Sequence, residues 1–286
     1  MTAARAAGLS ISPREVFQLR TAEAMARAQS SRVAEIVDHA DQPIGHVATT
    51  PIAAKVLGVS DAVRTFHQRA LIQTPSALTS EHAESALDAL VARHDALRGT
   101  LTSEGTLLVP ETNEAAVVFE TRALPAPLEE CGPLIVAETE RAVGRLNPAD
   151  GTMVSAVLFR PVTGPGRLLL VIHHAVVDGV SWRIILEDLA RAGIAAMNGD
   201  EPALAPVGTS VRRYAELVSE AVGAGRLDSE IEFWDSVTSA QRASLGRRAL
   251  DPAVDLARTA AARSITLPPE LADQLLGSVP RASEPM

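Results

Sequence analysis

Two periods of apolar residues run through the chain, one typical of helices and one of strands. Between residues 80 and 96 the apolar positions follow helical spacing, and this segment predicts a helix that opens at Thr79 or Ser80. Its inward stripe is predicted to be Ala83, Leu87, Leu90 and Val91. A helix is also predicted over 180–197, with four side chains directed toward a core: Ile184, Ile185, Leu189 and Ile194.

Shorter apolar or alternating runs predict strands, and Gly, Pro and Asn mark the turns between them. The strands are expected at 66–74, 106–110, 116–121, 153–160, 167–172 and 264–267. Further helices are expected at 21–28, 51–60, 134–146, 210–223, 228–240 and 269–277, and Ser12-Pro13-Arg14-Glu15 predicts the start of another helix. This mixture of hairpins and helices predicts an α/β fold, with a mixed sheet and flanking helices.

Composition places the chain among ordinary globular proteins. Its 286 residues are 47% apolar, and the net charge of −9 offers no basic footprint for nucleic acid. No segment resembles a signal peptide or a membrane span, so we expect no membrane partner and a cytoplasmic location. The single cysteine, Cys131, excludes a disulfide framework and a thiolate zinc cluster.

The stretch from His173 to Gly179 carries the candidate chemistry. Two adjacent histidines end an apolar run, and an Asp-Gly pair follows just before the predicted helix. Such a loop is held by rigid elements, and imidazole moves protons near neutral pH, so His174 is a candidate general base. The alternative is that His173 and His174 only pack at a strand end and Asp178 only caps the next helix.

The residues around the two histidines are candidates for supporting roles. Asp178 could hold the loop or pair with a cation, and Gly179 could adopt a backbone angle closed to other residues or allow close approach of a ligand. Adjacent strand residues point to opposite faces, which disfavours a metal site built from both histidines. Ser181 is close in sequence, but no Gly-x-Ser-x-Gly elbow supports a Ser-His-Asp triad.

A second candidate is the charged run that begins at Arg93 and ends at Arg98. It could simply be a basic helix end, favoured by the helix dipole. The functional alternative is that Arg98 pairs with Asp178 and braces the histidine loop.

The pattern His-His-x-x-x-Asp-Gly resembles the signature of the condensation-domain superfamily of nonribosomal peptide synthetases, whose fold is related to chloramphenicol acetyltransferase. Other segments are similar in the same order: Thr50-Pro51-Ile52, Arg93 to Arg98, Asn147-Pro148 and Phe233-Trp234. Asp178 to Leu189 looks most like the epimerization branch, and Phe66-His67-Gln68 resembles its Phe-Asn-Gln segment with His67 in place of Asn.

The resemblance also implies a domain organisation. Residues 1–30 look like the end of a peptidyl carrier domain, 31–43 like a linker, and 44–286 like the first lobe of a condensation or epimerization domain with the start of the second lobe. The family's second lobe carries a Glu, in a Glu-Gly-His-Gly-Arg-like motif, opposite the histidine. That motif is not found in these 286 residues.

By this resemblance the substrate is an aminoacyl or peptidyl thioester on the phosphopantetheine arm of a partner carrier domain. No cofactor or metal bound by this chain is implied. His174 is the expected catalytic residue, with His173, Asp178, Gly179, Arg98 and Ser181 in support. The expected reaction, for antibiotic-type secondary metabolism, is inversion of L to D configuration. Peptide-bond formation and a non-catalytic carrier-docking role stay open, and a second lobe or second copy could complete the site.

Overall fold

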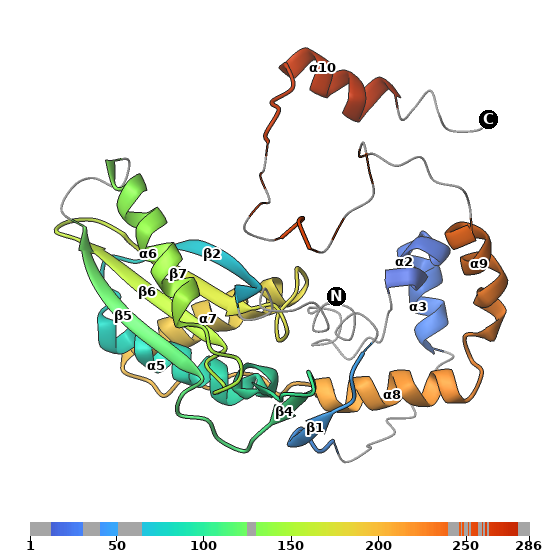
Figure 1. Ribbon diagram of the computed structural model, residues 1–286, viewed down its shortest axis with the longest axis horizontal. Coiled ribbons are helices and arrows are strands. Elements are labelled where there is room, and N and C mark those ends of the chain that lie inside the picture. The colour runs from blue at the N-terminus through green and yellow to red at the C-terminus, as the bar shows by residue number, and fades with distance from the viewer. Residues whose placement is uncertain are drawn as a thin grey trace. The chain divides into compact units, whose positions relative to one another are not determined.

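The computed structural model describes residues 13–30, 41–50, 65–124 and 130–239, and, farther on, residues 246, 248, 251, 253–256, 259, 261 and 263–279 (Figure 1). The chain divides into two compact units, Met1–Gln42 and Pro43–Met286.

The first unit contains two short helices, α2 (Pro13–Leu19) and α3 (Ala22–Ser30). Arg20 between them has a φ of 58°, and the Thr21 hydroxyl accepts a 3.2 Å hydrogen bond from the backbone N–H of Ala24. This side-chain bond satisfies a donor that the first turn of α3 leaves free. The two helices confirm the expected helical segments. Their relation to a carrier domain stays a prediction.

The second unit is built on a four-stranded sheet in the order β2-β7-β6-β5. The strands are β2 (His67–Thr74), β5 (Val117–Leu124), β6 (Val154–Pro161) and β7 (Gly166–His173). Only the β5–β6 pair is parallel among these neighbours, and the other two pairs are antiparallel. The predicted α/β class with a mixed sheet and flanking helices is confirmed.

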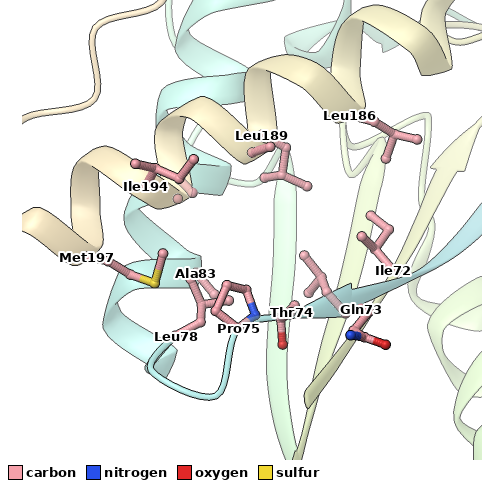
Figure 2. A pocket seen from close by; sticks show the side chains of 14 residues that line it. Ile72, Gln73, Thr74, Pro75, Leu78, Ala83, Leu186, Leu189, Ile194 and Met197 are labelled. Atoms are coloured by element: carbon pink, nitrogen blue, oxygen red, sulfur yellow. The ribbon is translucent and has the colours of Figure 1, made fainter. Parts of the chain in front are cut away.

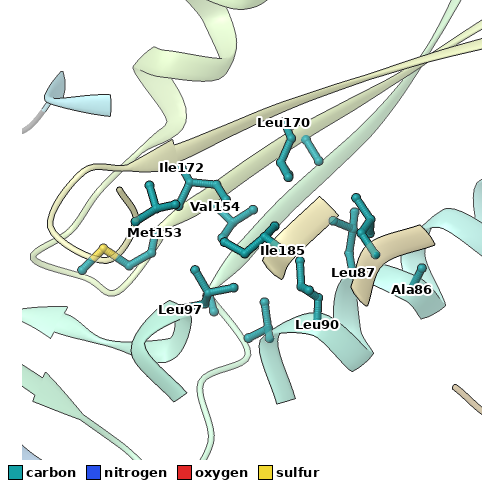
Figure 3. Close-up of a cluster of buried hydrophobic side chains, with 14 of the residues drawn as sticks. Ala86, Leu87, Leu90, Leu97, Met153, Val154, Leu170, Ile172 and Ile185 are labelled. Carbon is teal, nitrogen blue, oxygen red and sulfur yellow. The ribbon is translucent and has the colours of Figure 1, made fainter. Parts of the chain in front are cut away.

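Helices cover both faces of this sheet (Figure 1). One face packs against α5 (Ser80–Arg93) and α7 (Ser181–Asn198), and the other against α6 (Gly132–Arg145). Alternate residues of β6 and β7 supply the two cores, because successive strand side chains point to opposite faces. Figure 3 shows the larger core, in which Leu87 and Leu90 of α5 approach Val154, Leu170, Ile172 and Ile185.

A smaller sheet in the order β1-β4-β3 lies in the same unit. Its strands are β1 (Gly45–Val47), β3 (Thr100–Leu101) and β4 (Leu107–Val109), and a 3₁₀ turn, η2 (Asp95–Arg98), separates α5 from β3. The remaining described elements are α8 (Val211–Gly223), η4 (Asp228–Glu230), α9 (Ile231–Ser239), α10 (Pro269–Asp273) and the short π-helix η6 (Gln274–Ser278). The described part of the chain contains no helix that could span a membrane.

Several predictions about individual segments need correction or lie outside the description. Residues 264–267 form no strand, because no described strand pairs with them. On α7, Ile184 and Ile194 are 53% and 56% exposed, whereas Ile185 and Leu189 are buried as predicted. The short strands β1 and β3 were not predicted. The helix expected at 51–60 falls outside the described residues.

Candidate functional site

The two histidines of the motif have different surroundings. His173 ends β7 and is fully buried; its backbone N–H donates to Met153 O at 2.9 Å, and its Nδ1 accepts from the Ala175 N–H at 3.2 Å. His174 follows the strand and is partly exposed. The pair therefore divides into a packing residue, His173, and an accessible residue, His174.

The ring of His174 is held by residues from the start of β2. It stacks on Phe66 with centroids 4.6 Å apart and an interplanar angle of 12°, and its backbone N–H donates to Phe66 O at 2.8 Å. Its Nε2 lies 3.0 Å from Nε2 of Gln68. Because β2 pairs with β7 and His67 faces His173, the flanking residues Phe66 and Gln68 come close to His174.

Gln68 is also bound from α7. The indole Nε1 of Trp182, in the first turn of that helix, donates to Gln68 Oε1 at 2.7 Å. Phe66, Gln68 and Trp182 lie in segments whose sequence resembles the epimerization branch, but the sequence assigned these residues no role. His67, between Phe66 and Gln68, instead directs Nδ1 to Thr65 O at 2.6 Å.

Asp178 organises the turn that leads into α7. Its Oδ1 accepts from the N–H of Val180 at 3.0 Å and from both the N–H and the hydroxyl of Ser181 at 2.7 Å. The Asp178 N–H donates in return to the Ser181 hydroxyl at 3.2 Å. The hydrogen bond from the Ser181 hydroxyl, followed by those from the Ser181 and Val180 backbone, lowers the pKa of Asp178 below its usual range. Asp178 and Ser181 thus hold the turn that leads into α7, and the N-cap position of that helix is Val180.

Arg98 does not pair with Asp178, and that prediction is wrong. Its NH1 donates to the carbonyls of Val91 and Ala92, each at 2.8 Å, and its Nε donates to Pro110 O at 3.5 Å. The Val91 and Ala92 carbonyls belong to the last turn of α5, which has free acceptors and attracts a cation. The structure therefore supports the alternative interpretation, in which the charged run is a basic helix end.

Gly179 has no positive φ, so the predicted special backbone angle is also wrong. A Cβ built on Gly179 would have no heavy atom within 4 Å. The space in front of this residue is open, and the close approach of a ligand stays a prediction.

A hydrogen bond that the sequence analysis missed joins the two helices on this face. His94 caps the C-terminus of α5, and its Nε2 lies 2.9 Å from Oδ2 of Asp188 on α7. Both side chains are largely buried, with 16% and 13% exposure. Asp188 lies one position before the buried Leu189, so the inward stripe of α7 was the available signal.

An apolar pocket lies elsewhere on this unit (Figure 2). Leu186, Leu189, Ile194 and Met197 of α7 line it opposite Ile72, Thr74 and Pro75. No side chain that lines it can titrate, so it offers no acid or base. Within the described residues there is also no group of three or more His, Cys, Asp or Glu placed to hold a metal ion.

In this unit a mixed sheet lies between helices, and the accessible His174 at the end of β7 is held by residues at the start of the neighbouring strand β2. This arrangement defines a fold of the condensation type. Residues 58–278 match the sequence model of the Condensation domain, and the chain belongs to that family.

The chain is also similar to parts of much longer synthases. Tyrocidine synthase 1 of Brevibacillus parabrevis is 31% identical over 248 residues, which are 81% of this chain and 22% of that protein. Bacitracin synthase 3 of Bacillus licheniformis is 26% identical over 235 residues, which are 79% of this chain and 4% of that protein. The chain therefore spans a small part of these relatives.

Solved structures show the same fold. The epimerization domain from the third module of tyrocidine synthetase B superposes with a TM-score of 0.63 at 25% identity, covering 71% of this chain and 48% of that domain. The X-domain from teicoplanin biosynthesis gives a TM-score of 0.59 at 21% identity, over 71% of this chain and 46% of that one. The expected chloramphenicol acetyltransferase-like, condensation-type lobe is confirmed, and the chain spans about half of these solved domains.

Proposed function

We propose that this chain is an epimerization-type member of the condensation-domain family. It would act on an aminoacyl or peptidyl thioester carried by the phosphopantetheine arm of a peptidyl carrier domain. The observation that carries the proposal is the placement of His174, which is accessible and held by Phe66 and Gln68 at the end of β7. The similarity to a solved epimerization domain supports the same choice.

The chemistry would begin at the α-carbon of the thioester. His174 takes the α-proton, the electrons of the broken C–H bond pass into the thioester as an enolate, and a proton returns to the carbon. Return from the opposite face inverts the centre, and general acid–base steps of this kind contribute roughly 10²–10⁴-fold in rate. The resemblance assigns the opposite face to a Glu of a second lobe, or of another chain that completes the site.

The other residues of the motif would support His174 without touching substrate. His173 is buried and anchors the strand end, and Asp178 and Ser181 fix the turn into α7. Gly179 leaves open space beside this turn, where the thioester arm could approach. Arg98 secures the end of α5 and has no part in the chemistry.

A second candidate is peptide-bond formation, which the match to the Condensation domain model favours. In that reaction His174 would take a proton from an incoming amine or orient it, and two carriers would bind. The same residue thus serves both candidates, and the product separates them.

The test loads a carrier with an L-aminoacyl thioester, with or without a second carrier that bears an acceptor amine. Epimerization predicts D-aminoacyl product, or solvent exchange of the α-hydrogen, with the first carrier alone. A new amide that requires the second carrier would replace this proposal with condensation. If neither exchange nor a product forms and the chain only binds the carrier, the docking role is the better description.

A further inference from the structure

A continuous chain of hydrogen bonds runs from α7 through β2 to the histidine. Trp182 Nε1 bonds Gln68 Oε1 at 2.7 Å, and Gln68 Nε2 bonds His174 Nε2 at 3.0 Å. All three side chains are partly buried, which strengthens hydrogen bonds relative to those in water.

The direction of each bond follows from which groups can donate. An indole N–H only donates, so the atom of Gln68 that faces Trp182 must be the amide oxygen. The amide nitrogen of Gln68 then faces His174, and an amide nitrogen only donates. Nε2 of His174 is consequently the acceptor, and the proton of the neutral ring lies on Nδ1.

The ring cannot easily turn to offer Nδ1 instead. Phe66 stacks nearly parallel to it, and the backbone N–H of His174 is fixed to Phe66 O. The Gln68 amide cannot flip either without setting its two N–H donors against the indole N–H. Each contact thereby reinforces the same tautomer.

We propose that Gln68 and Trp182 are positioning residues, which hold His174 in the tautomer whose lone pair is on Nε2. This inference rests on the proposed function, in which His174 is the base. Before the substrate binds, the Gln68 N–H occupies the lone pair of Nε2 and so sets the tautomer. The substrate's α-hydrogen must displace this N–H before Nε2 can accept it. Gln68 affects the reaction only through His174. Trp182, in turn, acts through Gln68.

The tautomer can be measured without any turnover. The full chain is labelled with ¹⁵N-histidine, and the ring nitrogen resonances of its seven histidines are recorded at about pH 8.5, above the usual imidazole pKa of about 6.5. His174→Ala assigns the resonances of His174 by their loss. We expect a pyridine-type Nε2 and a pyrrole-type Nδ1 in the unmodified chain.

Two variants test the direction of these hydrogen bonds. Trp182→Phe keeps an aromatic ring but removes the indole N–H, so Gln68 becomes free to flip and the resonances of His174 shift toward a tautomer mixture. Gln68→Glu presents a carboxylate that only accepts, and it reverses the assignment to Nε2–H. Trp234→Phe is the matched control: Trp234 donates to Glu230 from α9, and its loss should leave His174 unchanged.

The inference is overturned if Nε2 carries the proton in the unmodified chain, or if neither variant changes the tautomer. Washout of α-deuterium from a carrier-bound thioester tests the functional consequence separately. We expect Trp182→Phe to lower kcat and leave KM unchanged, and Gln68→Glu to lower kcat by roughly 10²-fold or more. A tautomer shift without any effect of His174→Ala on washout would reject the proposed function and leave this inference intact.

Discussion

Trp182 and Gln68 are 114 positions apart in sequence, and the indole of one donates to the amide oxygen of the other at 2.7 Å. This bond ties the first turn of α7 to β2, the strand that supports His174. It means that the helix after the motif and the strand well before it jointly set the orientation of one imidazole.

Neighbouring isoleucines on α7 should differ sharply in their contribution to stability. Ile185 is 4% exposed, so Ile185→Ala should lower the free energy of unfolding by about 2–5 kcal/mol through lost burial and a cavity. Ile184 is 53% exposed, and Ile184→Ala should cost well under half as much. Urea denaturation of both variants measures the difference, and equal losses would contradict the observed helix orientation.

The hydrogen bond between His94 and Asp188 should couple α5 to α7. Removing either partner leaves a largely buried polar group, and each single alanine variant should cost roughly 1–3 kcal/mol. The double variant should cost less than the sum of the two, because the partners are then lost together. As a control, Glu23→Ala removes an exposed pair with Arg27 on α3 and should cost less than about 0.5 kcal/mol. Additive losses at His94 and Asp188 would show that the pair is not coupled.

Asp178 should stabilise the loop in a pH-dependent way. Its pKa in the folded chain lies below the ordinary value of 3.8, so its contribution is present above about that pH and is lost as the pH falls through the lower folded value. Asp178→Asn should therefore lower the free energy of unfolding at neutral pH by about 0.5–1 kcal/mol, in the lower part of the range for helix caps because the residue is exposed.

The matched control for Asp178 is Asp200→Asn, in the exposed loop after α7. Stability measured between neutral and acidic pH should show the difference between Asp178→Asn and the unmodified chain shrinking at low pH. A difference that stays constant with pH would mean that the ionised carboxylate is not the stabilising form.

Arg98 and Asp178 should act independently. They share no hydrogen-bond partner, so the losses of stability in Arg98→Ala and Asp178→Asn should add within about 0.5 kcal/mol in the double variant. A coupling energy clearly above about 0.5 kcal/mol would indicate that Arg98 and Asp178 form a salt bridge. Circular dichroism during thermal or urea unfolding is sufficient for this comparison.

Local pattern predicted much of the fold, because the elements bury one face or both. The apolar runs of β6 and β7 and the helical stripes of α5 and α7 are found within a few residues of their expected bounds. The error at Ile184 has a simple geometric cause: the inward stripe follows Ile185, Leu189 and Ala192, and Ile184 lies about 100° away around the helix. Residues 264–267 have strand-like composition, but a strand also needs a partner.

The motif indicated the candidate site, but the contacts within that site depend on tertiary structure. The sequence indicated His174 and a loop-holding Asp178, yet it could not show that Gln68 and Trp182 meet at the imidazole. That meeting depends on the pairing of β2 with β7, which joins segments about 100 residues apart. The assignment of Arg98 to Asp178 failed for the same reason, since charge alone does not fix which acceptor is nearest.

The central claim is that His174 is the base, and solvent exchange at the substrate α-carbon tests it most directly. A carrier-bound L-aminoacyl thioester deuterated at the α-carbon is mixed with the chain, and loss of deuterium is followed by mass spectrometry. His174→Ala should slow the washout by roughly 10²–10⁴-fold. His67→Ala, which removes a neighbouring histidine directed to Thr65 O, should leave the washout rate close to that of the unmodified chain. Equal washout with and without the His174 imidazole would contradict the account.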